Sequence, residues 1–521
     1  MRLRYAGALL AGAGLLGTTV HSKVQLAEVS QATSSSGTQD SFAQTNGLYR
    51  SAIFYWNALP IYTQYKLTEW WFSGSPYKES EPYYEFLHDR HAGTVERVCL
   101  LLKGFYLKSA QVASTRDDLL PNQYLSFCKR FQDEVPSELR GKDEVERAIR
   151  ESLGLDDLST VFEYVDPVPI GAASIGVVHR AKLRDGREVA VKIQFPEIEE
   201  RFRNDLATVK SFCSFALPSH MPFLDEIERQ FLTEFDYRRE AENQERIRRA
   251  ILPRWRQRVY VPYVVKDLCT KDVMVMELLR GENLIRSLVK QYEAYAASKG
   301  LTLAELMDDT KRDPKRKSWA ASLGSRVQGA LAILLPASAK PVDLQGVIST
   351  LLSVHAEEIF REGFFNADPH PGNIMLLSDG RIGLIDYGQC KELSLDKRLA
   401  YAKLVTRLAE KDEEGTVRQS WDMGLRTKHM NKEIIYKLLC FFHDRDSEDV
   451  TGDRNIQQFL DWADGIDPIV DLDEDYVLVG RVSILLRGLG NAFGIKLRVA
   501  PYWKKEALRL MRIHGIEGTR R

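Results

Sequence analysis

FFNADPHPGNIMLLSDGRIGLIDYGQ, residues 364–389, places Asp368 five residues before Asn373 and ends an apolar run, RIGLI, at Asp386. Such a run is typical of a buried strand. Phosphoryl transfer needs one carboxylate to orient or deprotonate the attacking hydroxyl, and a carboxylate with an amide oxygen to hold Mg²⁺ against the phosphates. The stretch therefore predicts a phosphoryl-transfer site with Asp368 as the catalytic residue and Asn373 and Asp386 as metal ligands. The alternative is a turn-rich loop punctuated by Pro and Gly.

A phosphate-binding segment is predicted upstream. VAVKI, residues 189–193, matches the strand whose lysine grips the α- and β-phosphates of a nucleotide, which makes Lys192 that lysine. The preceding GAASIGVV, residues 171–178, fits the loop pattern G-x-G-x-x-G-x-V, with an alanine in place of the second glycine. A glycine-rich match alone is weak, but the strand lysine at this spacing strengthens it. The nucleotide-contacting candidates in the loop are Gly171, Ala172, Ala173, Ser174, Gly176 and Val178.

Two further segments complete this nucleotide site. Glu240 lies in a charged helical stretch, FLTEFDYRREAEN, and is the predicted partner of Lys192. The alternative is a surface ion pair within that helix. The strand end MELL, residues 276–279, is suited to contact adenine through Glu277 and Leu279.

Composition limits the class of protein. The length of 521 residues predicts about three modules. The 72 Lys and Arg residues nearly balance the 73 Asp and Glu residues, and this net charge of −1 argues against a dedicated nucleic-acid-binding protein. The six cysteines are widely separated and form no CxxC pair, which indicates buried free thiols rather than a zinc site or a disulfide framework. A metal, if present, would need oxygen ligands.

The chain changes texture along its length. Residues 1–22 have two arginines before a small-residue apolar run and predict a targeting segment or a marginal membrane anchor. The apolar stretch 476–493 contains Arg481 and Arg487, so a buried helix or a membrane-surface helix is favoured over a membrane span. The remaining predicted parts are a flexible linker at 23–47, a helical extension at 48–160, a sheet-containing lobe at 161–280, a catalytic lobe at 281–410 and a helical region at 411–521.

Several motifs in this order resemble the UbiB or AarF-domain-containing atypical kinases. KSAQ, residues 108–111, is similar to the family's K-x-G-Q motif, with Ala110 in place of its glycine. Glu234-Phe235-Asp236 matches the family's E-x-D, and Glu240 follows as its helix glutamate. NADPHPGN, residues 366–373, matches the family's H-A-D-P-H-P-G-N loop except that Asn366 replaces the histidine. The likeness covers roughly residues 101–393.

The resemblance implies a fold and an activity. The fold would be α+β, a bilobal protein-kinase-like body with a helical N-terminal extension and a helical C-terminal tail. Lys108 and Gln111 would reach the site from that extension, opposite Glu234 and Asp236, and would exclude peptide substrates. The ligands would be ATP, or ADP, with Mg²⁺, and the setting isoprenoid-quinone or lipid metabolism on a mitochondrial inner membrane, with a plastid as the alternative.

Two other functions stay open. A pseudokinase scaffold would bind nucleotide and organise other proteins or lipids without turnover. A small-metabolite phosphotransferase shares the D-x-x-x-x-N loop, but it explains neither the KSAQ and EFD motifs nor the N-terminal segment.

Overall fold

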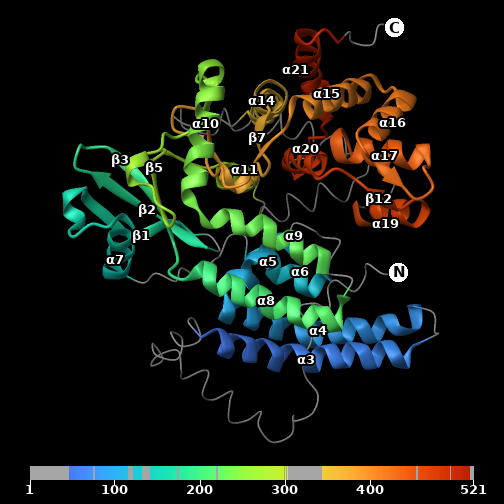
Figure 1. The fold of residues 1–521 in the computed structure, drawn as a ribbon, viewed down its shortest axis with the longest axis horizontal. Coiled ribbons are helices and arrows are strands. Elements are labelled where there is room, and N and C mark those ends of the chain that lie inside the picture. The colour runs from blue at the N-terminus through green and yellow to red at the C-terminus, as the bar shows by residue number, and fades with distance from the viewer. Residues whose placement is uncertain are drawn as a thin grey trace, which may run out of the picture. The chain divides into compact units, whose positions relative to one another are not determined.

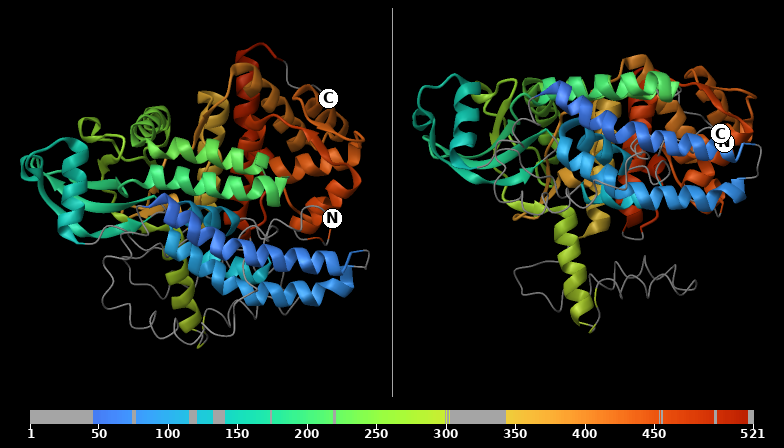
Figure 2. Two further views of the ribbon diagram at one scale, coloured as in Figure 1. Left: turned by 60° about the horizontal axis from the view of Figure 1, so that its bottom comes forward. Right: turned by 90° about the horizontal axis from the view of Figure 1, so that it is seen from below.

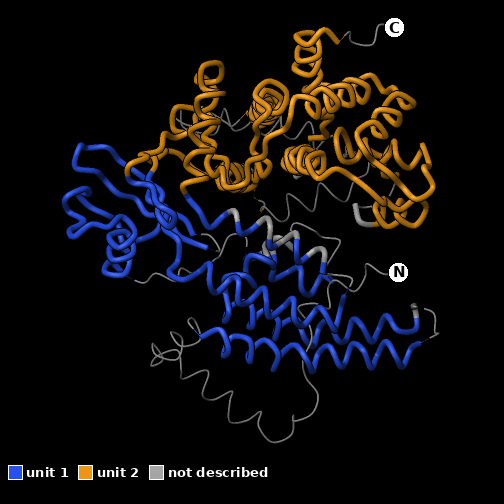
Figure 3. Tube along the Cα trace, viewed as in Figure 1, with its two compact units in different colours: residues 1–237, 268–275 blue, residues 238–267, 276–521 orange. Residues whose placement is uncertain are grey.

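The computed structural model shows a mixed α/β chain (Figure 1). It describes residues 46–73, 77–114, 121–131, 141–172, 175–218, 221–298, 300, 302, 343–452, 454, 456–492 and 495–516. The predicted targeting segment, nearly all of the predicted linker, and Ala173 and Ser174 of the phosphate loop lie outside the described residues. The chain divides into two compact units, residues 1–237 with 268–275 and residues 238–267 with 276–521 (Figure 3).

The first unit contains an antiparallel sheet in the order β1-β2-β3-β5. Alternating apolar residues in β3 bury Val189, Val191 and Ile193, which is why this run forms a half-buried strand. Gly186 turns the chain between β2 and β3 with a φ of 91°, a conformation that glycine adopts without strain. The strands are β1 (Phe162–Ala172), β2 (Gly176–Leu183), β3 (Glu188–Gln194) and β5 (Val273–Glu277).

Helices make up the rest of this unit. The side chain of Asn46 caps α3 (Gly47–Trp71) by accepting hydrogen bonds from two backbone N–H groups. Helices α3 and α4 (Tyr77–Leu102) lie side by side in both Figure 1 and Figure 2. A buried ion pair between Arg50 and Asp205 joins α3 to α8 (Ile198–Ala216), with Arg50 Nε 2.9 Å from an Asp205 oxygen. The other helices are α5 (Gly104–Ser114), α6 (Asn122–Arg130), α7 (Lys142–Leu153) and α9 (Met221–Leu232).

The second unit is built around a small sheet in the order β4-β9-β8-β6. Its strands are β4 (Val259–Tyr260), β6 (Gly281–Asn283), β8 (Ile374–Leu377) and β9 (Ile382–Leu384), and a second pair joins β7 (Phe364–Asn366) to β10 (Cys390–Glu392). We refer to residues 364–389 as the predicted catalytic stretch. The helices that precede it in this unit are α10 (Tyr237–Trp255), α11 (Leu284–Ser298) and α14 (Leu344–Ala356). A π-helical turn, Glu357–Glu362, continues α14 toward β7.

A helical assembly follows the catalytic stretch and shares one apolar core with it. Its elements are α15 (Leu395–Glu410), α16 (Glu413–Asp422), β11 (Arg426–Thr427), α17 (Lys432–His443), α18 (Glu448–Thr451), α19 (Ile456–Ile466), β12 (Ile469–Asp471), α20 (Glu474–Ala492) and α21 (Val499–Ile513). Trp503 of α21 is fully buried, and its indole N–H donates to the Leu352 carbonyl of α14 at 2.9 Å. The C-terminal helices are therefore part of the folded body of this unit.

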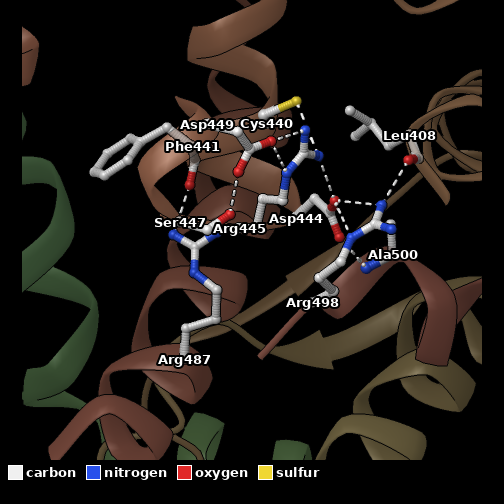
Figure 4. A network of polar contacts seen from close by, with 10 residues as sticks. All are labelled: Leu408, Cys440, Phe441, Asp444, Arg445, Ser447, Asp449, Arg487, Arg498 and Ala500. Carbon is white, nitrogen blue, oxygen red and sulfur yellow. Dashed lines mark hydrogen bonds and ion pairs between the residues drawn. The ribbon is translucent and has the colours of Figure 1, made fainter. Parts of the chain in front are cut away.

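A buried charge network lies within these C-terminal helices (Figure 4). Asp444, with no exposed surface, accepts hydrogen bonds from Arg445 at 2.9 Å, from Arg498 at 2.8 Å and from the backbone N–H of Ala500 at 3.0 Å. Arg487 is buried beside it, donates to the Phe441 carbonyl, and has its pKa lowered by burial. Two positive side chains thus share one buried carboxylate, as a desolvated charge requires.

Helix α20 contains most of the apolar stretch 476–493. Val479, Val482, Leu486 and Leu489 are buried in the core of the unit, so the interpretation as a buried helix is correct. Within the described ranges, no helix combines the length and the apolar content needed to cross a membrane. All six cysteines lie in the described part of the chain as free thiols, four of them buried.

Candidate active site

The catalytic stretch begins where β7 ends. After Asp368, the sequence Pro-His-Pro-Gly forces a tight path: His370 accepts a hydrogen bond from the N–H of Gly372 at 3.0 Å and caps the short 3₁₀ turn Pro371–Asn373. Strand β8 starts directly after that turn. The loop therefore presents Asp368 and Asn373 from two fixed ends, a strand terminus and a helical turn.

Asn366 links the two predicted carboxylates. Its Oδ1 accepts a hydrogen bond from the N–H of Asp368 at 2.9 Å, and its Nδ2 donates to the carbonyl of Asp386 at 3.1 Å. Asn366 is buried, so these bonds form in a poorly hydrated setting where they hold geometry well. The residue that departs from the family motif thus connects the loop of Asp368 to the loop of Asp386.

Asn373 and Asp386 are brought together by the β8-β9 hairpin. Ile374 pairs with Leu384, and the N–H of Ile385 donates to the Asn373 carbonyl at 3.1 Å. Asp386 has a φ of 73°, unusual for a residue other than glycine. Its Oδ1 accepts from the N–H of Gly388 at 3.1 Å.

These donors fit magnesium. Mg²⁺ prefers oxygen ligands and is commonly held by one or two carboxylates together with substrate phosphates. One carboxylate and one amide oxygen meet that preference without a dedicated protein cage. In the described ranges, no group of three His, Cys, Asp or Glu side chains is placed to hold a metal by itself.

A polar cluster is buried beneath the loop. Glu358, in the π-helical turn, accepts from the backbone N–H of Asn366 at 3.2 Å and is almost fully buried. Burial raises the pKa of Glu358 to about 8, the hydrogen bond from Asn366 opposes this rise, and the negative charge of Glu357 adds to it. Burial lowers the pKa of His355, on the same side of the loop, to about 4. The loop therefore rests on side chains that are neutral near pH 7.

Arg481 of α20 is a site residue that the sequence analysis did not identify. Its Nη2 lies 3.0 Å from Oδ1 of Asp368, and its Nη1 donates to Oε1 of Gln389 at 3.1 Å. The sequence analysis treated Arg481 only as a charge that makes a membrane span costly. An arginine inside an apolar helix needs a partner, and that was the available signal, but spacing alone could not show that the partner is Asp368.

The described nucleotide-loop candidates of the first unit lie on two paired antiparallel strands, β1 and β2. Gly171 and Ala172 lie in β1 opposite Val178 and Val177 of β2. A Cβ at Gly176 would collide with the Ile193 carbonyl and the Tyr237 hydroxyl, so this glycine is required by packing. This need is separate from any approach to phosphate.

Lys192 lies on β3, directly across from Val178. Its Nζ stands 4.8 Å from the centre of the Tyr237 ring, a cation–π distance. The predicted partner Glu240 is buried near the start of α10 in the second unit, where a Cβ on Gly388 would lie 3.8 Å from one of its oxygens. Glu240 therefore neighbours the loop of Asp386, and its pairing with Lys192 stays a prediction.

The KSAQ and EFD motifs meet within the first unit. Lys108 of α5 forms an ion pair with Glu234 at 2.8 Å, with both side chains largely buried, and its Nζ lies 5.1 Å from the Phe231 ring. Glu234 lies in a 3₁₀ turn, Thr233–Phe235, just before Asp236. Ala110 has no exposed surface, so its methyl group is part of the packing at the position where the family has glycine. The side chain of Gln111 lies outside the described residues.

The predicted adenine contact, Glu277 and Leu279, lies at the end of β5. Glu277 accepts a hydrogen bond from the Tyr260 hydroxyl at 2.8 Å, and its N–H donates to the Tyr263 carbonyl at 2.9 Å. Burial is the larger cause, and this hydrogen bond the next, of a raised pKa for Tyr260. Leu279 packs near Gly383 of β9. Glu277 and Leu279 are thus both held by contacts within the second unit.

Known proteins share the sequence pattern of this chain. A protein from Arabidopsis thaliana, ACTIVITY OF BC1 COMPLEX KINASE 3, chloroplastic, is 25% identical over 433 residues, which cover 80% of this chain and 54% of that protein. AarF domain-containing protein kinase 1 from Gallus gallus is 28% identical over 365 residues, 67% of this chain and 60% of that protein. The chain thus spans little more than half the length of these relatives.

A family model covers the larger part of the chain. Residues 130–420 match the ABC1 atypical kinase-like domain. The matched region contains strands β1 and β2, Lys192, the E-x-D turn and residues 364–389 described above. The expected kinase-like fold is confirmed by this match together with the two small sheets and their helices. The chain belongs to the ABC1 atypical kinase-like family, which includes the AarF and UbiB proteins.

Proposed function

We propose that the protein is a Mg²⁺-dependent atypical kinase or ATPase that acts on ATP and transfers phosphate to a non-protein acceptor or to water. The observation that carries this proposal is the Asn366 bridge, because it holds the loop of Asp368 and the loop of Asp386 in one hydrogen-bonded unit. A bridge of this kind supports catalysis, since preorganised groups need no rearrangement at the moment of reaction.

Each predicted site residue of the second unit has a defined role in this proposal. Asp368 orients the attacking hydroxyl or accepts its proton, because its carboxylate lies two residues after β7 and its side chain is 25% exposed. Asn373 and Asp386 would hold Mg²⁺, which when bound neutralises charge on the phosphates. Glu240, next to Gly388, braces the metal loop and remains the proposed partner of Lys192.

The first unit supplies the phosphate and gate residues. Lys192 lies on β3, an inner strand of the sheet, and would contact the α- and β-phosphates. Strands β1 and β2, which carry Gly171 and Gly176, would lie on the other side of the phosphates. Lys108, with Gln111, would cover the site and exclude peptides, and its ion pair with Glu234 supports a fixed position for that lysine. Asp236 is the second carboxylate of this gate.

The protein acts, in this proposal, on quinone-like or other lipid substrates at an organelle membrane. The name of the Arabidopsis relative places that protein in chloroplasts, and the N-terminal arginines and apolar run of this chain support a mitochondrial or plastid address. One face of α3 also exposes several large apolar side chains, among them Trp56, Trp70 and Trp71. Tryptophan is enriched where proteins meet the membrane interface.

The Asp386→Asn variant tests the metal assignment. Changing a residue that merely supports a metal ligand typically weakens metal affinity 10- to 100-fold, so loss of a ligand charge should lower Mg²⁺-dependent ATP affinity by at least about tenfold. Calorimetric titration with ATP, with and without Mg²⁺, measures this. Asp379→Asn is a matched control, because Asp379 lies in the exposed turn between β8 and β9 and pairs with Arg381. Equal binding and turnover by Asp386→Asn and wild type would show that the metal assignment is wrong.

The alternative function is a pseudokinase scaffold. Both functions predict nucleotide binding, so turnover decides between them. Single-turnover hydrolysis of ATP, with and without a quinone-like lipid, should yield product in the presence of Mg²⁺ if the protein is an enzyme. Tight binding with no product under either condition would favour the scaffold.

A further inference from the structure

Helix α20 lies beyond the matched kinase-like domain, which ends at residue 420, yet it provides a charged group to the catalytic loop. One guanidinium, that of Arg481, contacts Oδ1 of Asp368 at 3.0 Å and Oε1 of Gln389 at 3.1 Å. Asp368 belongs to the catalytic loop, and Gln389 follows directly after the Asp386-Tyr387-Gly388 segment. A single side chain therefore joins the two loops that carry the proposed chemistry.

The position of Arg481 along α20 is set by contacts on both sides of it. At the start of the helix, Asp475 pairs with Lys391 of β10 and with Lys397 of α15, each at 2.6 Å. Burial would raise the pKa of Asp475, but the hydrogen bonds from these lysines outweigh it, so the pKa lies below its ordinary value. Val479 and Val482, on either side of Arg481, have no exposed surface. The helix cannot slide or turn without breaking these contacts.

The catalytic loop lacks a cation of its own. Between Asp368 and Asn373 the sequence is Pro-His-Pro-Gly, and the His370 ring is engaged by the N–H of Gly372. A guanidinium keeps its charge at any pH that proteins tolerate, and its planar donors fit a carboxylate and an amide oxygen at once. The Asp368 and Arg481 side chains are 25% and 35% exposed, so the pair is shielded but open toward a ligand.

We propose that Arg481 is a positioning residue for Asp368. It holds Oδ1, so that Oδ2 is the oxygen directed to the attacking hydroxyl, and it keeps the carboxylate in register with the metal loop through Gln389. This role rests on the proposed function, in which the Asp368 carboxylate must face the attacking hydroxyl. The C-terminal region is in this way a working part of the active site.

Steady-state kinetics of the full chain test this role. Arg481→Gln should reduce kcat about 10- to 100-fold, since displacement of a reacting group by about 1 Å costs on the order of 100-fold. The KM for Mg-ATP should stay within about twofold, because the proposed phosphate and metal contacts come from other residues. Arg481→Lys should recover part of kcat, because it restores the charge but not the two-pronged contact. Arg418→Gln is the control, since Arg418 is an exposed arginine of the same unit that pairs with Glu414.

The outcomes separate this role from the proposed function itself. If the wild type turns over ATP and the kcat of Arg481→Gln is equal or higher, the role of Arg481 is overturned and the kinase assignment is left intact. Wild type with no turnover under any condition would overturn both. A fall in kcat with an equal rise in KM would indicate general disruption and also count against positioning. If Arg481→Gln does not fold, Gln389→Leu, which removes one of the two anchors, should still lower kcat at constant KM.

Discussion

Glu358 is a carboxyl group that the folded protein keeps protonated at neutral pH. Its pKa is about 8 in the folded chain against an ordinary value of 4.5, chiefly because it is buried. Between these two values the unfolded chain releases the proton and the folded chain keeps it, so the free energy of unfolding falls as pH rises. The fall is at most about 1.4 kcal/mol per pH unit, is absent below pH 4.5 and stops above pH 8.

Glu358→Gln should remove this dependence. The amide resembles the protonated carboxyl and can still accept the hydrogen bond from the N–H of Asn366. Urea denaturation at several pH values between 5 and 8 should show the variant gaining stability relative to wild type as pH rises. Glu414→Gln, at an exposed position, should run parallel to wild type. Parallel curves for Glu358→Gln as well would mean that Glu358 is ionised in the folded state.

Asn366 shows where a sequence motif is limited at the residue scale. The motif marked Asn366 only as a departure from the family histidine. The structure shows an amide with one donor and one acceptor directed at Asp386 and Asp368, a role that needs both functions of the side chain. The positions of Asp368, Asn373 and Asp386 followed from spacing because the stretch is continuous, whereas the bridge depends on tertiary contacts of β7, which pairs with β10.

At the scale of elements, the buried carboxylate of Asp444 secures the C-terminal helices. It ends α17 and contacts Arg445, Arg498 and the backbone at the start of α21 (Figure 4). Asp444→Asn removes the buried negative charge, so that Arg498 loses this carboxylate partner while Arg445 keeps its ion pair with Asp449 at 2.7 Å. Breaking a buried pair in this way costs about 3–5 kcal/mol.

Chemical denaturation of the Asp444→Asn variant should therefore show a loss of about 3 kcal/mol in unfolding free energy. The exposed Arg418–Glu414 pair is the comparison, because surface pairs contribute about 0–1 kcal/mol. A loss for Asp444→Asn as small as that of the surface pair would show that water reaches the network. Loss of this network should also weaken the contact of α20 with Asp368, because Arg487 of α20 borders the network.

Elements with strong local patterns were predicted well. The alternation in VAVKI and the apolar run RIGLI correspond to β3 and β9, and the stretch 476–493 corresponds closely to α20. The π-helical turn before β7 and the approach of α20 to the catalytic loop were not predicted, because neither has a periodic signal. Gly176 was assigned to phosphate approach, and its packing against Ile193 and Tyr237 depends on tertiary contacts that spacing does not show.

At the scale of the whole molecule, the exposed face of α3 bears on where the protein works. The spacing of its exposed large apolar residues places them on one side of the helix, and α4 adds Tyr83, which contacts Phe72 with ring centres 4.8 Å apart. The most exposed of these side chains are Trp56 at 83%, Trp71 at 76%, Trp70 at 72% and Leu67 at 57%. Folded proteins rarely expose several tryptophans together unless a partner covers them.

The joint variant Trp56→Ser, Trp70→Ser should bind membranes more weakly. Burying a large apolar side chain contributes about 1.5–3 kcal/mol, and about 1.4 kcal/mol corresponds to tenfold in affinity, so the partition coefficient should fall about tenfold or more. Flotation with phosphatidylcholine vesicles, with and without an anionic phospholipid, measures this. Thermal stability should stay the same, because both side chains are exposed.

As a control, Trp255→Phe alters a tryptophan that is partly buried and bonded to Glu357 in the other unit, and it should leave flotation unchanged. If the joint variant floats as well as wild type, the α3 face does not dock on lipid. In that case we expect any membrane binding to come from residues 1–22, whose removal should abolish flotation.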